Sequence, residues 1–204
     1  MPRSRLVTSD DWPEAELRAA VLAGELVAVG ACWASPVEPQ TPSLRAAAAA
    51  WTLRDARLIA GTRTAAWIWG ATSRPPTPLE AAISPQARVH VDAGVRLREV
   101  VIDPTDVVRM GGPDGPGGLG VTTPLRTAID LLRTPSTGER TFGTAQAEAV
   151  RGLITIGAVS VTEVEERLCG LGTIPLVRQA SRRLRALLEP DQPAFVADQP
   201  ALTR

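Results

Sequence analysis

Residues 121–133, VTTPLRTAIDLLR, decide the class of the fold because a short apolar strand pattern here runs directly into an amphipathic helix. Thr123 has a side chain suited to a helix N-cap, and Pro124 suits the first helical position, where no backbone N–H is needed. Arg126 and Asp130 lie four residues apart, and we expect them on the outer side of this helix. Apolar residues at helical spacing form its inward face: Leu125, Ala128, Ile129 and Leu132.

The segment before this helix, from Leu79 to Val121, alternates with a period of two. Short loops separate the strand candidates, which are LEAAIS (79–84), RVHVD (88–92), GVRLREVVI (94–102) and DVVRM (106–110). These strands predict a small, mostly antiparallel sheet.

The part of the chain before residue 79 is predicted to be mainly helical. Thr41 and Pro42 have the N-cap and first-position chemistry of a helix that continues through the alanine-rich segment 43–55. RLIAG, from Arg57, reads as a short buried strand, and TRTAAWIWG follows as a compact helix that ends at Gly70. The five tryptophans all lie at or before Trp69, where we expect them to pack rather than to stack on bases.

A smaller unit is predicted at the N-terminus, in residues 1–36. A helix from Trp12 to Ala23, with Asp11 and Glu14 at capping-box spacing, is followed by a β-hairpin over residues 26–34. One helix and one hairpin resemble a winged helix, although the unit is short enough to be truncated. The prolines of residues 35–42 mark a linker.

Three further helices are predicted after residue 142, at about 143–153, at 162–168 behind a Thr162/Glu165 capping box, and at 175–188. The proline-rich residues 190–204 are expected to be disordered or loosely docked. The predicted fold class is therefore α+β: a small N-terminal winged-helix-like unit, then an α+β domain over 37–189 with a mostly antiparallel sheet and C-terminal helices.

The numbers of charged residues and the spacing of the two cysteines limit the classes of function that the protein can have. The chain has 22 basic and 22 acidic residues, so it lacks the overall positive field of proteins that bind nucleic acid through phosphates alone. Cys32 and Cys169 show no paired spacing, which indicates free thiols in a reducing compartment. No apolar run has the length of a signal peptide or a membrane span. We expect a cytoplasmic protein without a membrane partner.

No catalytic, metal or cofactor site is predicted. GPGGLG, residues 115–120, matches the dinucleotide pattern formally, but it leads into a strand-like segment rather than a helix and is better explained as a loop. His90 is expected to be an ordinary strand histidine, and Cys32 lies in an apolar hairpin without a cation to lower its pKa. We therefore expect no enzyme activity and no small-molecule substrate.

One cluster of charge is unbalanced. Along PLVRQASRRLRALL, residues 175–188, Arg178, Arg182 and Arg185 follow helical spacing with Arg183 alongside, and no acidic residue interrupts them. This pattern fits either a solvated helix face or a docking surface for an acidic protein or a nucleic-acid backbone.

The order of these segments resembles a known family. EAELRAAVLAGELVAVGACWA (14–34), RLIAGTRTAAWIWG (57–70), DVVRMGG (106–112) and VTTPLRTAIDLLR (121–133) together are similar to the AbiEi-type antitoxins of bacterial type IV toxin-antitoxin and abortive-infection systems. The resemblance covers about residues 14–190. It implies a winged N-terminal unit that represses its own promoter and a C-terminal domain that counters a nucleotidyltransferase toxin encoded nearby.

The N-terminal unit departs from this family pattern. Its DNA-binding candidates are Arg3, Arg5 and Arg18, but five acidic residues accompany them in residues 1–36, and the positions after GELV lack the arginines usual in the wing. The supporting helix of a helix-turn-helix is also missing before residue 12. The first hypothesis is thus an antitoxin-like, protein-binding regulator that uses Arg178, Arg182, Arg183 and Arg185, and the alternative is a DNA-binding repressor of its own operon.

Overall fold

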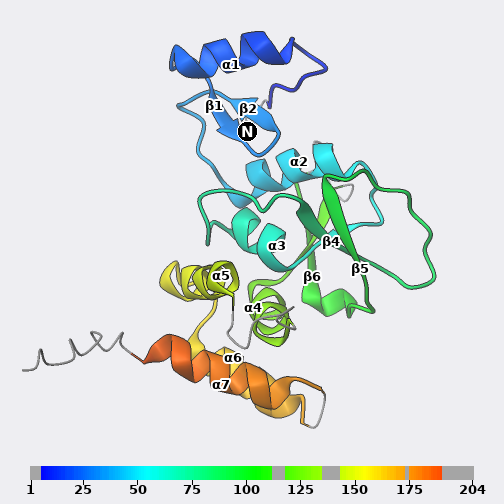
Figure 1. The fold of residues 1–204 in the computed structure, drawn as a ribbon, viewed down its shortest axis with the longest axis vertical. Coiled ribbons are helices and arrows are strands. Elements are labelled where there is room, and N and C mark those ends of the chain that lie inside the picture. The colour runs from blue at the N-terminus through cyan, green and yellow to red at the C-terminus, as the bar shows by residue number, and fades with distance from the viewer. Residues whose placement is uncertain (1–5, 112–117, 135–142, 173–174, 190–204) are drawn as a thin grey trace, which may run out of the picture.

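The computed structural model describes residues 6–111, 118–134, 143–172 and 175–189. The N-terminal unit lies at one end, the β-sheet with two helices lies in the middle, and four helices form the other end (Figure 1). The α+β class predicted from the sequence is confirmed. The predicted tail, residues 190–204, lies outside the described residues, as do Arg3 and Arg5.

The N-terminal unit contains one helix and one hairpin, as the sequence predicts: α1 (Glu14–Leu22), β1 (Val27–Val29) and β2 (Cys32–Ala34). The predicted Asp11/Glu14 capping box is wrong. Pro13 is the N-cap residue, and Asp11 instead accepts hydrogen bonds from the backbone and hydroxyl of Thr8. The turn before α1 therefore uses the Asp11 carboxylate, and the helix begins two residues later than expected.

The middle layer is built from the predicted helix, strand and helix: α2 (Pro42–Leu53), β3 (Ile59–Ala60) and α3 (Thr62–Trp69). Thr41 caps α2 by accepting a hydrogen bond from the backbone N–H of Leu44 at 3.2 Å, and Gly70 ends α3 in the left-handed conformation. The caps that the sequence predicts at both helices are thus present.

The sheet has five strands in the order β5-β4-β3-β7-β6. Its remaining strands are β4 (Leu79–Ile83), β5 (Val95–Glu99), β6 (Val107–Met110) and β7 (Leu119–Thr122), and a short 3₁₀ helix, η1 (Pro104–Asp106), precedes β6. The pairs β3/β4 and β6/β7 are antiparallel, but β3/β7 and β4/β5 are parallel. The expected mostly antiparallel sheet is therefore wrong: the sheet is mixed, because the loop after β4 carries the chain back so that β5 runs in the same direction.

The predicted strand at residues 88–92 is also wrong. These residues form a loop between β4 and β5 in which Val89 and Val91 pack against the core while His90 is exposed. The alternation of apolar and polar residues arises because one side of this loop is buried. A strand gives the same sequence pattern, but this loop has no neighbouring strand among the described residues to pair with.

The four C-terminal helices are α4 (Pro124–Arg133), α5 (Thr144–Thr155), α6 (Val161–Gly170) and α7 (Val177–Leu188). Thr123 and Pro124 begin α4 as predicted, whereas the capping box of α6 is Ser160/Glu163 and not Thr162/Glu165. α4 lies at the centre of this layer and packs against α3, α5, α6 and α7. No described helix is long and apolar enough to cross a membrane.

Two apolar cores meet at α3. Trp67 belongs to the core shared by the hairpin, α2 and the sheet, and Ala66 belongs to the core shared by the C-terminal helices. The tryptophans pack as expected except Trp12, which is 58% exposed. Because consecutive residues of α3 contribute to both cores, the helix joins the middle layer to the C-terminal layer.

Candidate functional site

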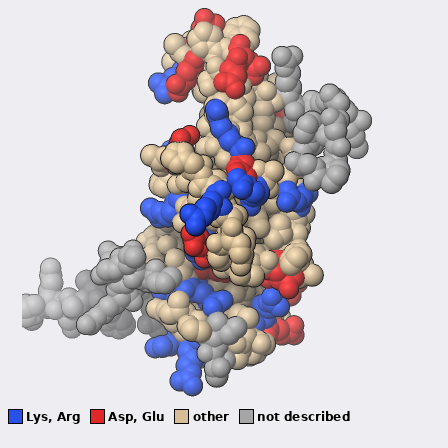
Figure 2. Space-filling model, turned by 90° about the vertical axis from the view of Figure 1, so that its right-hand side faces the viewer, with Lys and Arg blue, Asp and Glu red and all other residues tan. Residues whose placement is uncertain are grey.

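The arginines of α7 form an exposed basic stripe, defined here as Arg178, Arg182 and Arg185. Val177, Ala180 and Leu184 bury the opposite face of α7 against the C-terminal core. Within the described part of the chain, no ion pair joins the stripe to a carboxylate. Basic side chains are visible at the lower end of the molecule in Figure 2, where α6 and α7 lie.

Arg183 does not belong to this stripe, and its assignment to the predicted partner surface is wrong. Its side chain is turned inward and only 7% of the residue is exposed. Nη1 donates hydrogen bonds to the carbonyl oxygens of Leu132 and Thr134, both at 2.7 Å. Burial lowers the pKa of Arg183 from its ordinary value. Its role is to hold α7 against the end of α4, which helical spacing alone does not reveal.

The N-terminal unit has the charge that the sequence predicts. Residues 1–36 contain three arginines and five acidic residues, a net charge of 3 − 5 = −2, and Arg18 is the one of these arginines that lies among the described residues. Arg18 also forms an ion pair with Glu14 at 2.7 Å. The upper end of the molecule in Figure 2 is accordingly dominated by acidic side chains. This surface repels a phosphate backbone.

The residues weighed for catalysis are not brought together. Cys32 is buried and its pKa is raised to about 11, first by burial and then by the charge of Asp11. His90 is exposed on a loop, and Leu119 and Gly120 lead the glycine-rich segment into β7 rather than into a helix. Among the described residues, no three His, Cys, Asp or Glu side chains form a group that could hold a metal ion.

A second charged site was missed by sequence reasoning, and its centre is Asp130. We expected Arg126 and Asp130 on the outer side of α4, but that expectation is wrong: Asp130 is only 4% exposed. Asp130 Oδ2 lies 3.1 Å from Arg126 Nε and 3.0 Å from Arg98 Nη2, so one carboxylate oxygen joins α4 to β5.

The same network continues to the 3₁₀ helix and to α6. Arg126 Nη1 lies 3.1 Å from Asp106 Oδ2, and Arg167 Nη2 lies 3.3 Å from the same oxygen. Burial alone would lower the pKa of Arg126, but the nearby charge and hydrogen bonds of Asp130 and Asp106 outweigh burial and raise it. The guanidinium therefore stays charged inside the fold. The Arg126 side chain is only 15% exposed because η1 and β5 cover the side of α4 that the isolated helix would expose.

Glu80, on the neighbouring strand β4, is the second carboxylate of the site. It accepts hydrogen bonds from Thr62 Oγ1 at 2.6 Å, from the backbone N–H of Arg63 at 3.0 Å and from Arg63 Nε at 2.9 Å. Burial would raise the pKa of Glu80, but the hydrogen bonds of Arg63 and Thr62 together lower it. Arg96, directly opposite Glu80 in the β4/β5 register, reaches it only at 3.8 Å.

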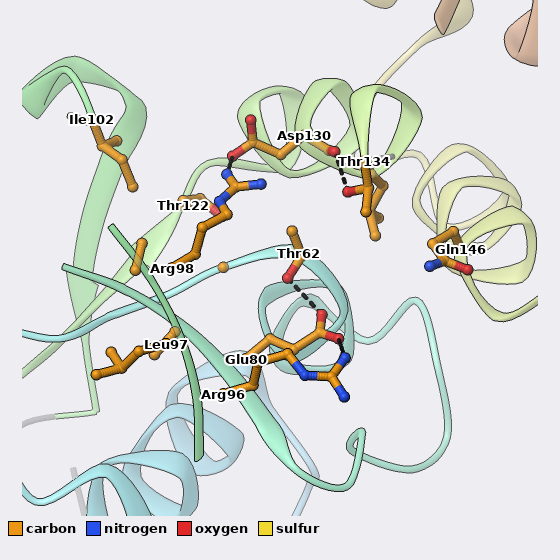
Figure 3. Close-up of a pocket in the computed structure, with 14 residues that line it drawn as sticks. Thr62, Glu80, Arg96, Leu97, Arg98, Ile102, Thr122, Asp130, Thr134 and Gln146 are labelled. Atoms are coloured by element: carbon orange, nitrogen blue, oxygen red, sulfur yellow. Dashed lines mark hydrogen bonds and ion pairs between the residues drawn. The ribbon is translucent and has the colours of Figure 1, made fainter. Parts of the chain in front are cut away.

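An open cleft of about 270 Å³ lies between these two carboxylates. Figure 3 shows Glu80, Thr62 and Arg96 on one side, Arg98, Asp130 and Thr134 on the other, and Gln146 of α5 at the end. Ala81, Ala82, Ile102 and Leu131 contribute apolar surface to it. The alternation of Arg96 and Arg98 in the sequence could have indicated that both lie on one face of a strand; nothing in the sequence places Asp130 or Gln146 beside them.

Comparison with known proteins adds little to this geometry. No family model matches the chain, and no curated protein matches it. Among solved structures, the chain is similar to the RV2827C protein from Mycobacterium tuberculosis, with 19% sequence identity over 91% of this chain and 73% of that chain, and a TM-score of 0.45. A likeness at this level assigns no function.

Proposed function

We propose that this protein is an antitoxin-like regulator that acts in the cytoplasm, binds a nucleotidyltransferase-type toxin encoded nearby, and catalyses no reaction. The observation that carries the proposal is the basic stripe of α7. Its three arginines are exposed and, within the described residues, have no acidic partner in the fold. The resemblance of residues 14–190 to AbiEi-type antitoxins supports the choice of partner.

The stripe suits an acidic protein surface. Arg178 and Arg185 are seven residues apart, which corresponds to about 10 Å along a helix, so the stripe spans two turns. Guanidinium groups bind carboxylates through paired N–H donors, and a positive patch also speeds the encounter with an acidic partner. α7 is held in place by its apolar face and by Arg183, so it presents the stripe on a rigid element.

The alternative, repression of its own promoter by the N-terminal unit, has weaker support. The helix and hairpin of a winged unit are present in residues 14–34. The described surface of this unit is acidic, however, and Arg18 is already paired with Glu14. Phosphate attraction supplies most of the affinity of such modules for duplex DNA, so this unit lacks the main source of binding.

Growth rescue by co-expression tests the proposal. The toxin candidate from the neighbouring gene is expressed with the wild-type protein or with a variant in which Arg178, Arg182 and Arg185 are replaced by glutamate. A control variant carries the same change at three exposed arginines outside α6 and α7: Arg54, Arg74 and Arg88.

At equal soluble levels we expect rescue by the wild type and by the control variant, and loss of rescue by the stripe variant. Rescue by the stripe variant equal to that of the wild type would show that the stripe is only a solvated face. Absence of rescue by the wild type, with the toxin active, would reject the antitoxin function itself.

A further inference from the structure

The cleft beside Glu80 and Asp130 has more positive than negative charge around it. Two carboxylates, Glu80 and Asp130, face four guanidinium groups, which belong to Arg63, Arg96, Arg98 and Arg126. The next ion pair outward, Arg167 with Asp106, adds one charge of each sign. The four guanidinium groups and two carboxylates therefore have a net charge of 4 − 2 = +2, and counting Arg167 and Asp106 as well leaves this value unchanged.

Of the four guanidinium groups, those of Arg96 and Arg98 line the cleft together with the two carboxylates. Arg63 binds Glu80 through two side-chain N–H groups and its backbone N–H, so Glu80 has little capacity left for Arg96 at 3.8 Å. The Arg96 side chain is 65% exposed and that of Arg98 is 45% exposed. Arg96 is thus a charged hydrogen-bond donor beside the cleft, and no described carboxylate lies close enough to be a strong acceptor for it.

Arg96 and Arg98 are placed to act together. They are alternate residues of β5, so they project from the same face of the strand with Cα atoms about 7 Å apart. Figure 3 shows their side chains on the cleft side of β5, with Arg98 directed toward Asp130. An anionic group between the two guanidiniums would accept charge-assisted hydrogen bonds from both.

The interior of the cleft is apolar and small. Ala81 and Ala82 leave room beside Ile102 and Leu131, and the volume of about 270 Å³ lies near the lower end of the range for ligand pockets, roughly 300 to 1,000 Å³. Thr134 and the amide of Gln146 add polar atoms to the lining. The cleft is less suited to a cation, because guanidinium groups already neutralise its two carboxylates.

We propose that this cleft binds a small organic anion, a compact apolar body with one carboxylate or phosphate group, whose anionic group is held by Arg96 and Arg98. The proposal is independent of toxin binding, because the cleft is lined by the sheet, α4 and α5, with no residue of α7. The two anion classes share the same recognition chemistry, and the choice of probes separates them.

Isothermal titration calorimetry on the full chain tests the proposal with four probes of similar size: benzoate, phenyl phosphate, benzyl alcohol and benzylamine. We expect at least one of the two anions to bind with a Kd at or below about 1 mM, which ordinary ligand efficiencies allow for so small a molecule. The neutral and cationic probes should bind at least about tenfold more weakly, because they lack the charge-assisted hydrogen bonds.

Arginine variants then locate the site. Arg96→Gln should weaken binding of the anion about tenfold or more, whereas Arg88→Gln removes the same charge from an exposed loop residue that does not line the cleft and should leave binding unchanged. Arg98→Gln should weaken binding similarly, with thermal unfolding used to confirm that the variant is folded.

Three outcomes would overturn the proposal: no heat from either anion at about 10 mM, well above the expected Kd; equal binding of benzyl alcohol and the anions; or equal effects of Arg96→Gln and Arg88→Gln. Selective binding of benzoate or of phenyl phosphate would support it and identify which anion the cleft prefers.

Discussion

Arg183 of α7 donates a hydrogen bond of 2.7 Å to the carbonyl oxygen of Leu132, in the last turn of α4. The carbonyl groups in the last turn of a helix have no partners within the helix, and here the guanidinium of another helix supplies one. The same Nη1 atom also donates to the carbonyl oxygen of Thr134, just beyond the helix. One buried cation thus holds α7, which carries the basic stripe, against the end of α4.

Replacing Arg183 by methionine should destabilise the protein by about 1 to 3 kcal/mol, because the carbonyl groups of Leu132 and Thr134 lose their donor in a buried place. Arg182→Met, at the exposed neighbouring position, is the matched control and should change stability by no more than about 0.5 kcal/mol. Urea unfolding measures both. Equal unfolding midpoints for the two variants would mean that the Arg183 hydrogen bonds make no net contribution to the stability of the protein.

Asp130→Asn should cost about 2 to 3 kcal/mol of stability. The substitution leaves Arg126 and Arg98 facing a neutral amide, and removing one partner of a buried ion pair is costly because the other charge remains enclosed. Glu14→Gln, which breaks the exposed pair with Arg18, should cost less than about 1 kcal/mol. A similar loss of unfolding free energy in the two variants would contradict the buried network.

Stability should depend on pH through Glu80. Its pKa is lower in the folded protein than its ordinary value of 4.5, so the ionised form is favoured by folding. This contribution is fully present above pH 4.5 and is lost as the pH falls through the folded pKa. The stability difference between wild type and Glu80→Gln should therefore shrink between about pH 5 and pH 3, as measured by urea unfolding. A difference independent of pH over that range would be inconsistent with an ionised Glu80.

Gly152→Ala should destabilise the protein, although alanine usually stabilises a helix interior by about 0.5 to 1 kcal/mol relative to glycine. A Cβ atom at Gly152 in α5 would lie 2.1 Å from the carbonyl oxygen of Ala71, which is backbone. Gly170→Ala, near the end of α6, has open space and should be neutral or stabilising. If thermal unfolding ranks the two variants in the opposite order, the close approach of α5 to Ala71 is wrong.

Duplex DNA should bind only weakly, with a Kd of roughly 10⁻⁴ to 10⁻⁶ M at physiological salt or without measurable affinity. Arg18→Ala should change this little, because Arg18 is paired with Glu14 in an acidic unit. A mobility-shift titration on the protein's own promoter, against a scrambled duplex, measures the affinity. Nanomolar binding that is lost in Arg18→Ala would favour the repressor instead.

Two of the wrong predictions have the same cause. Residues 88–92 have the alternation of a strand, and Arg126 with Asp130 has the spacing of an exposed helix pair, yet the structure places the first in a loop and the second under β5 and η1. Local pattern reports which side of a segment is apolar. It does not report whether a ladder partner is present or whether another element covers the polar side.

The sequence by itself determined the local elements: the capped starts of α2 and α4, the hairpin of residues 27–34, the glycine end of α3 and the acidic character of the N-terminal unit. These depend on contacts within a few residues, which a chain specifies directly. Only the tertiary structure decided the mixed direction of the sheet, the inward turn of Arg183, and the cleft between Glu80 and Asp130. These features depend on residues far apart in the chain: 120 − 59 = 61 positions separate Ile59 from Gly120 in the β3/β7 pair, and 51 positions separate Arg183 from Leu132. A charged side chain such as that of Arg183 is buried, against its preference for water, only once those distant elements have packed.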